Sequence, residues 1–227
     1  MQVNADFTRP VTISAERYHW VPSTQPGVER MMFDRIGGEK ARATTVVRYA
    51  ANSSFPCHAH PGGEEILVLS GTFSDSSGDY PEGWYLRNPP ASSHTPFSHQ
   101  GATIFVKLWQ MRPDDSQTLR VNTKDPKNWQ NQHGREICFL FADQYETVSL
   151  QKIPMFSEVC DLAPNATEIF VVSGSIKYDG NDYPEGSWLR LPKGNTSNIY
   201  TNEQGATVYI KQGEFVNLAS EVTYHDT

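Results

Sequence analysis

Three histidines and one glutamate stand at a spacing that is typical of metal ligands. His58 and His60 are separated by one residue, Glu64 follows Pro61-Gly62-Gly63, and His94 comes after a second turn-rich segment. Residues i and i+2 of a strand point to the same face, so the first two imidazoles project together. The Pro-Gly-Gly turn then reverses the chain, and Glu64 begins the returning strand. Imidazoles with a carboxylate suit zinc, manganese, iron, nickel or copper.

The chain contains a second copy of the segment that carries these residues. The run from Ser70 to Pro89 recurs 103 positions later, from Ser173 to Pro192, and the sequence Asp-Tyr-Pro-Glu-Gly is unchanged between the copies. This period is too long for a solenoid repeat and indicates two duplicated domains. Short apolar runs between Gly, Pro, Asn and Asp turns predict that both domains consist of β-strands.

The second copy keeps none of the four candidate ligands. The residues at the corresponding positions are Asp161, Ala163, Thr167 and Ser197. One carboxylate and two hydroxyls are too few ligands for a transition metal. We therefore predict that the second domain is metal-free and structural, with its turns and apolar strands retained for folding.

The repeat also distinguishes two adjacent glutamates. Glu65 is retained as Glu168 in the copy without ligands, which indicates a structural role, whereas Glu64 is replaced. Glu64 also shares a strand face with Ile66 and Val68, which are expected to line the interior of the domain. We therefore exclude Glu65 and predict that the metal ligands are His58, His60, Glu64 and His94.

The first copy resembles the cupins. Their two motifs, GX5HXHX3–4EX6G and GX5PXGX2HX3N, are matched here by His58, His60, Glu64, Gly71, Gly83, Pro89 and His94. Three positions that are not ligands depart from the motifs, with Gly, Gly and Asn replaced by Asn52, Ala91 and Ser98. Residues 20–110 are similar in particular to the cupin domain of ChrR-type anti-sigma factors, and the rest of the chain resembles it as a weaker repeat.

The resemblance, together with the repeat, implies an all-β chain of two tandem cupin barrels, which are double-stranded β-helices of the jelly-roll type. The metal-binding domain is expected at 20–112 and the degenerate, metal-free domain at 135–216, with a polar linker between them. One divalent metal ion is expected per chain. Zinc is the first choice, and iron, manganese and nickel are alternatives because the same ligand set serves several ions.

Composition and charge exclude several classes of partner. The 227 residues carry a formal net charge of −7 with a pI near 5.5, which argues against nucleic acid because phosphate binding needs a basic face. No apolar run approaches the length of a membrane span. The first residues lack the basic and apolar regions of a signal peptide, and the three cysteines form no disulfide framework, so we expect a cytoplasmic protein.

Three functions remain open at this point. The ChrR-type resemblance implies a regulatory or sensory protein, connected with transcription regulation, that binds a metal and a small ligand. Related single-domain cupins are instead metal-dependent dioxygenases or isomerases, in which an open metal position does the chemistry. The third function is binding of a small molecule without turnover. No general base apart from the ligands is identified, so the catalytic residues stay unknown.

The expected partner is a small-molecule ligand or substrate. Binding of a sigma factor by the ChrR-type route is not expected, because that route needs a helical domain with His and Cys zinc ligands, and the first twenty residues are too short and lack them. Leu67 and Leu69 lie on the strand face opposite Glu64 and need cover from the sister domain or from a second subunit. A homodimer is therefore one expected arrangement.

Overall fold

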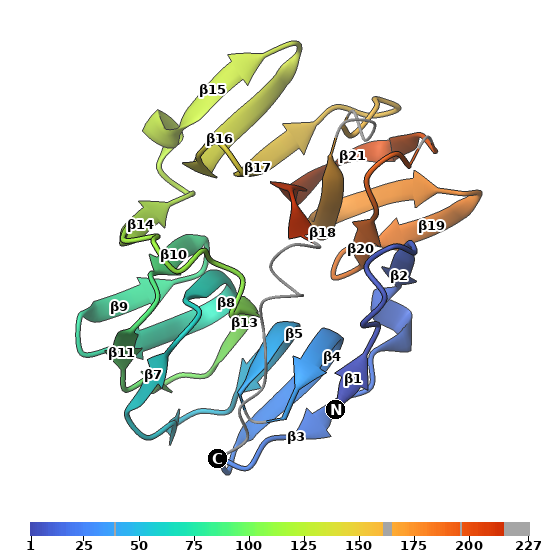
Figure 1. Cartoon of the computed structure of the whole chain (residues 1–227). Helices are drawn as coiled ribbons and strands as arrows, with labels where there is room; N and C mark the ends of the chain where they lie inside the picture. Colours follow the sequence, from blue (N-terminus) through green and yellow to red (C-terminus); the bar gives the residue numbers. More distant parts are fainter. Residues whose placement is uncertain (39, 161–164, 196, 216–227) are drawn as a thin grey trace. The chain divides into compact units, whose positions relative to one another are not determined.

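Antiparallel β-strands are the main structural element of the chain (Figure 1). This computed structural model describes residues 1–38, 40–160, 165–195 and 197–215. Within these ranges the helical elements are two single turns of 3-10 helix, η1 at Ala15–Arg17 and η2 at Pro126–Asn128. The all-β prediction is therefore confirmed. None of the helices that the structure describes is long and apolar enough to cross a membrane.

The chain divides into two compact units. Of the described residues, unit 1 contains 1–5 and 19–124, and unit 2 contains 6–18 and 125–215. Both units take in residues outside the spans predicted from the sequence, 20–112 and 135–216. The additional residues come from the N-terminal segment and from the polar linker, and both of these segments contribute strands.

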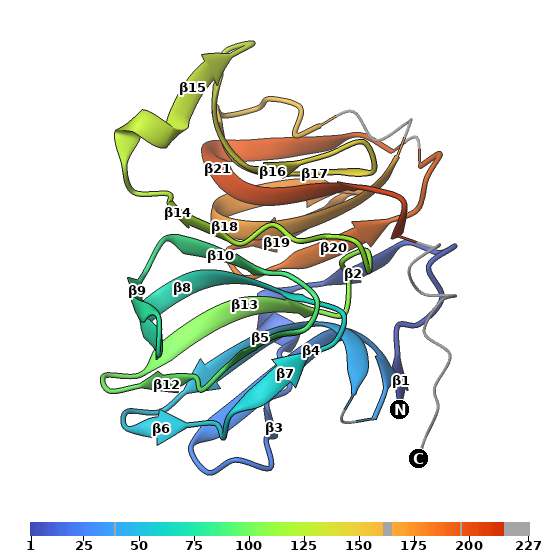
Figure 2. The ribbon, with the colours of Figure 1, turned by 60° about the vertical axis from the view of Figure 1, so that its left-hand side comes forward.

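Unit 1 is built around one antiparallel sheet, whose strands run side by side in Figure 2. In spatial order the sheet contains β1 (Gln2–Val3), β4 (Val28–Gly37), β5 (Ala41–Tyr49), β13 (Ala102–Leu108), β8 (Glu64–Asp75), β10 (Trp84–Asn88) and β14 (Leu119–Asn122). Shorter strands complete the unit, and they are β3 (Val21–Pro22), β6 (Ser53–Ser54), β7 (His58–His60), β9 (Gly78–Pro81), β11 (Ser92–His94) and β12 (Phe97–Ser98).

Unit 2 repeats the same arrangement. Its sheet contains, in spatial order, β15 (Trp129–Gln132), β16 (Arg135–Ala142), β17 (Glu146–Ile153), β21 (Ile199–Gly213), β18 (Ala166–Tyr178), β20 (Trp188–Leu191) and β2 (Val11–Ile13), and β19 (Asn181–Pro184) pairs with β18. The order β4-β5-β13-β8-β10 of unit 1 thus corresponds to β16-β17-β21-β18-β20. The sequence repeat is therefore also a repeat of strand order.

Each unit contains one strand that lies, in the sequence, just before the repeat that forms the other unit. β14 precedes β16 in the chain but pairs with β10 of unit 1, with Tyr85 opposite Val121. β2 precedes β4 but pairs with β20 of unit 2, with Thr12 opposite Leu189. The segments before and between the repeats are therefore parts of the sheets and not loose connections.

The apolar core of unit 1 lies on the face of the sheet that includes Ile66 and Val68. Successive strand residues point to opposite faces, so these two side chains share a face with Glu64, as the sequence pattern predicts. They pack with side chains from the neighbouring strands, among them Ile104 and Val106 of β13. The β-branched residues among them suit a half-buried pleated surface.

Gly71 marks a close approach of two strands, and we predict that its replacement is costly. Its φ is +71°, and an added Cβ would lie 2.1 Å from the carbonyl oxygen of Gly101. Gly71→Ala should therefore lower the free energy of unfolding by more than the roughly 1–2 kcal/mol of a left-handed backbone alone. Gly134→Ala is the matched control, because its φ of +79° is similar and no atom lies within 4 Å of the added Cβ. Equal shifts of the urea midpoint for the two variants would contradict this account.

Candidate metal centre

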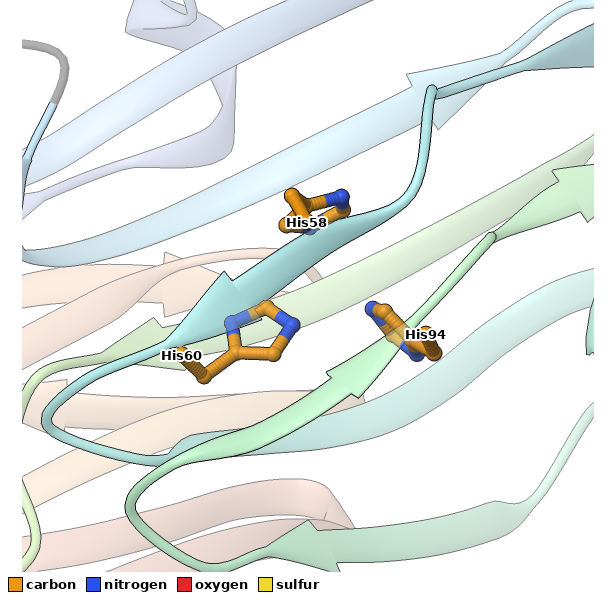
Figure 3. A group of neighbouring side chains, drawn as sticks. All are labelled: His58, His60 and His94. Carbon is orange, nitrogen blue, oxygen red and sulfur yellow. The ribbon is translucent and has the colours of Figure 1, made fainter.

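Two short paired strands bring the three predicted histidines together. His58 and His60 lie on β7, and His94 lies on β11, which pairs with β7 so that His94 is directly opposite His58. Figure 3 shows the three rings facing one another. One ring nitrogen from each residue lies within 4.8 Å of the others. This separation is suited to three ligands around one ion.

The carboxylate of Glu64 faces two of these imidazoles. Its Oε2 atom lies 3.5 Å from Nε2 of His60 and 3.5 Å from Nε2 of His94, and all three side chains are buried. Glu65 is placed differently, because its Oε2 atom lies 3.2 Å from Nη1 of the buried Arg87 on the adjacent strand β10. The structure thus brings Glu64 to the histidines and places Glu65 in a buried ion pair.

A second set of groups orients these side chains. His94 Nδ1 lies 3.2 Å from Oδ2 of Asp75, and His58 Nδ1 lies 2.9 Å from the carbonyl oxygen of Pro56. The side-chain amide of Asn88 donates to Oε2 of Glu64 at 3.0 Å. An acceptor at Nδ1 holds the proton on that nitrogen and leaves Nε2 as the metal-binding atom. The arrangement therefore favours ligation through Nε2 for His58 and His94.

Two of the imidazole nitrogens provide a direct test of whether a metal fits this site. His60 Nε2 and His94 Nε2 are fully buried and have no hydrogen-bond partner among the described residues. The 3.5 Å separation from Glu64 is too long for a good hydrogen bond. Buried polar atoms are nearly always satisfied in native proteins, so each exception needs an explanation. A divalent cation between these atoms would satisfy both nitrogens and the carboxylate.

The protonation states also suit a cation. Burial, together with the charge of His58, lowers the pKa of His60 to about 4. Burial likewise lowers the pKa of His94, although the neighbouring Glu64 carboxylate opposes this shift. Burial raises the pKa of Glu64, while His94 and the amide of Asn88 counteract the change. Neutral imidazoles at physiological pH can bind a metal without first losing a proton.

Asp75 and Asn88 were not identified from the sequence. A signal for both exists in the repeat, because their counterparts 103 positions later are Tyr178 and Leu191. These two residues belong to the apolar core of unit 2. The polar residues that contact the candidate ligands are therefore absent from the copy that lacks those ligands, and a comparison of the copies at every position would have revealed them.

The counterparts of the ligands in unit 2 are only partly described. Thr167 is buried and its hydroxyl accepts from the Nε2 amide of Gln212 at 3.2 Å, whereas Ser197 is exposed. Asp161 and Ala163 lie outside the described residues. The prediction that unit 2 binds no metal therefore stays a prediction.

A cavity of about 430 Å³ opens onto the ligand cluster. His58, His60 and Glu64 form part of its wall, and most of the remaining wall is apolar, with contributions from Val47, Ile104, Val106, Leu108 and Trp109. Pockets of this size and composition are typical of sites for small molecules. A molecule in this cavity would reach a metal held by the cluster directly.

Comparison with known proteins identifies a family. The ChrR cupin-like domain matches residues 8–112 and 161–216 of this chain. Comparison with curated proteins finds no significant match.

Solved structures show a similar fold at low sequence identity. A nickel(II) complex of the bacterial pirin YhhW from Escherichia coli has a TM-score of 0.66 and 12% identity, and the match covers 90% of this chain and 98% of the pirin. A deletion mutant of the oxalate decarboxylase OxdC from Bacillus subtilis has a TM-score of 0.58 and 12% identity, with coverage of 90% and 77%. AerE from Microcystis aeruginosa has a TM-score of 0.62 and 15% identity, with coverage of 87% and 97%.

The buried histidines predict a pH-dependent stability for the metal-free protein. Between pH 6.5 and about 4 the unfolded chain protonates His60 and the folded chain does not. Stability should therefore fall as the pH falls through this window. The contribution of His60 alone should reach roughly 3 kcal/mol near pH 4.

Urea unfolding of the metal-free protein at several pH values measures this effect. His60→Gln should reduce the loss of stability at acidic pH, whereas His99→Gln, at an exposed histidine, should keep the wild-type dependence. An identical pH dependence for all three proteins would refute the assignment of the effect to His60.

Proposed function

This chain belongs to the ChrR cupin-like family, and from that premise we propose that unit 1 binds one divalent metal ion per chain and presents it to a small molecule. The proposed ligands are His58, His60, Glu64 and His94. The observation that carries this proposal is the pair of buried Nε2 atoms of His60 and His94, which lack hydrogen-bond partners among the described residues and face the carboxylate of Glu64. A cation is the group that three imidazoles and a carboxylate accommodate best.

The composition of the ligand set supports a metal that stays open to another molecule. Closed structural zinc sites usually contain cysteine, and this set contains none. The cavity of about 430 Å³ adjoins three of the four ligands. A bound divalent ion with a free coordination position can polarise an oxygen atom of a ligand or activate a water molecule.

Zinc is the proposed ion, with iron, manganese and nickel as alternatives. Neutral imidazoles and a carboxylate bind all of them, so availability and geometry decide between them. A cytoplasmic location is also proposed, and it is supported by the free thiols of Cys57 and Cys138.

We predict that the metal content depends on Glu64 and not on Glu65. Glu64→Gln and His94→Ala each remove a ligand and should weaken metal affinity by at least about 100-fold. Loss of a group that only supports a ligand weakens metal affinity by up to about 100-fold, and loss of a ligand itself should have at least that effect. Glu65→Gln is the matched control, because it changes the adjacent residue in the same way and disturbs the ion pair with Arg87 instead. Elemental analysis after purification from metal-balanced medium measures the content. A full equivalent in the His94→Ala protein would show that the ligand assignment is wrong.

The resemblance to the cupin domain of ChrR-type anti-sigma factors supports a sensory or regulatory use of the site, in which a small ligand on the metal changes the behaviour of the protein. Catalysis is a second candidate, favoured by the cavity beside the ligand cluster. Both uses require a metal ion on the same ligands and the same access to it. The difference between them is turnover.

Oxygen consumption distinguishes the two candidates. For the sensory function we expect that zinc copurifies with the protein and that the iron(II)-loaded protein consumes no more oxygen with pentane-2,4-dione than iron(II) in buffer does. Sustained oxygen uptake by the iron(II) protein that is absent from the His94→Ala variant would establish catalysis and overturn the sensory assignment.

A further inference from the structure

The charges around the cavity of unit 1 are opposite to those of the chain as a whole. The chain carries 26 acidic and 19 basic residues. Of the described residues that line the cavity, three are cationic, namely Arg30, Arg35 and Lys40, and Glu64 supplies the carboxylate. A divalent metal on the ligand cluster would make the cavity still more positive. Such a cavity favours a small anion over a neutral or cationic ligand.

Arg30 and Arg35 reach this cavity because β4 contains an irregularity. The register between β4 and β5 shifts between Met32 and Asp34. Without this shift, strand alternation would place residues 30 and 35 on opposite faces. With it, Arg30 lies opposite Val47 and Arg35 lies opposite Ala43, and both arginines line the cavity.

The guanidinium of Arg30 is held in place but is not neutralised. Its Nη2 donates to Oγ of Ser23 at 2.9 Å, and no carboxylate in the described part of the chain forms an ion pair with it. Arg48 on the neighbouring strand differs, because it forms an ion pair with Glu29 at 2.6 Å and is half exposed. Arg30 therefore retains donors for an anion in the cavity.

Tyr49 supplies a second donor to the same cavity. The residue is 6% exposed, and its ring is held by edge contacts with Phe55 and Phe73 at centroid distances of 5.8 and 5.9 Å. Among the described residues its hydroxyl has no hydrogen-bond partner. Burial and the carboxylate of Glu64 raise the pKa of the phenol, while Arg30 lowers it, so the hydroxyl stays protonated at neutral pH.

The strand register makes Tyr49 and Arg30 neighbours. Val28 pairs with Tyr49, and Arg30 pairs with Val47, so the two side chains are diagonal neighbours on one face of the β4–β5 pair. Diagonal neighbours of this kind lie about 7 Å apart, within reach of long side chains. A single carboxylate could therefore accept from both.

The repeat shows that both residues accompany the metal ligands. Ala102 pairs with Tyr49 in unit 1, and its counterpart Ala206 pairs with Ile153 in unit 2. By the same register Arg30 corresponds to Ile137. The copy without the ligands thus carries two isoleucines, whereas scaffold residues such as Arg87 are retained, in that case as Arg190.

We propose that the molecule bound at this metal centre is a small organic carboxylate, whose carboxylate group is held by the Arg30 guanidinium and the Tyr49 hydroxyl. This inference rests on the proposed metal function, because the metal is the group that would hold the other end of the ligand. The apolar wall of Val47, Ile104 and Val106 accommodates a short hydrocarbon portion. Water molecules would satisfy the same two donors, and the affinity for a carboxylate distinguishes a carboxylate site from a hydrated one.

Calorimetric titration with pyruvate, and with pyruvamide as its neutral analogue, tests the proposal on the metal-loaded protein. Arg30→Gln should weaken pyruvate binding by at least about tenfold, and Tyr49→Phe by about threefold or more, because charge-assisted and neutral hydrogen bonds are lost. Pyruvamide binding should be the same in the wild type and in Arg30→Gln. The matched control is Arg48→Gln, which removes the same charge outside the cavity and should bind pyruvate like the wild type.

The outcomes separate this inference from the proposed metal function. Equal pyruvate affinity for Arg30→Gln and Arg48→Gln, or no binding of pyruvate at millimolar concentration to a metal-loaded protein, overturns the carboxylate assignment and leaves the metal site intact. Pyruvate binding that depends on Arg30 in a protein that takes up no metal supports the anion site and refutes the metal function. Metal content and circular dichroism of each variant confirm that it is folded.

Discussion

The centre of unit 1 depends on two imidazole nitrogens that are buried without hydrogen-bond partners among the described residues. Each such atom costs about 1–3 kcal/mol if nothing satisfies it. The pairing of β7 with β11 and the turn before β8 place His60 Nε2 and His94 Nε2 around the Glu64 carboxylate at 3.5 Å. The fold thus accepts a local cost in the metal-free state, and a bound cation would remove it. Metal affinity and folding stability would therefore be linked at this site.

The interiors of the two units are filled by different kinds of side chain at corresponding positions. Unit 1 keeps polar groups in its interior, where Asp75 contacts His94 and Asn88 donates to Glu64. Unit 2 has Tyr178 and Leu191 at the corresponding positions, and both pack in a continuous apolar core. A polar interior needs every donor and acceptor to find a partner, whereas an apolar interior needs only matching shape. The duplicated sequence therefore separates the residues that surround the histidine cluster of unit 1 from the residues that both units retain.

Local patterns in the sequence predicted the all-β fold and the residues that come together, because His58 and His60 share a strand and strand parity separates Glu64 from Glu65. The same parity rule fails for Arg30 and Arg35, since a register shift inside β4 brings both to one face. Asp75 and Asn88 were missed because neither belongs to a recognised motif, and their contacts with His94 and Glu64 are made between strands and not within one. The pairing of β2 with β20 has no local signal, because it joins residues more than 170 positions apart.

β2 and β14 each pair with the sheet of the repeat that they do not precede in the sequence, and this exchange bears on how a duplicated chain could arise. A single ancestral copy that folded in the same way would have lacked its own last strand, and it could have obtained that strand only from another molecule. Duplication and fusion would have turned such an exchange between two chains into one within a single chain, where the effective concentration no longer depends on dilution.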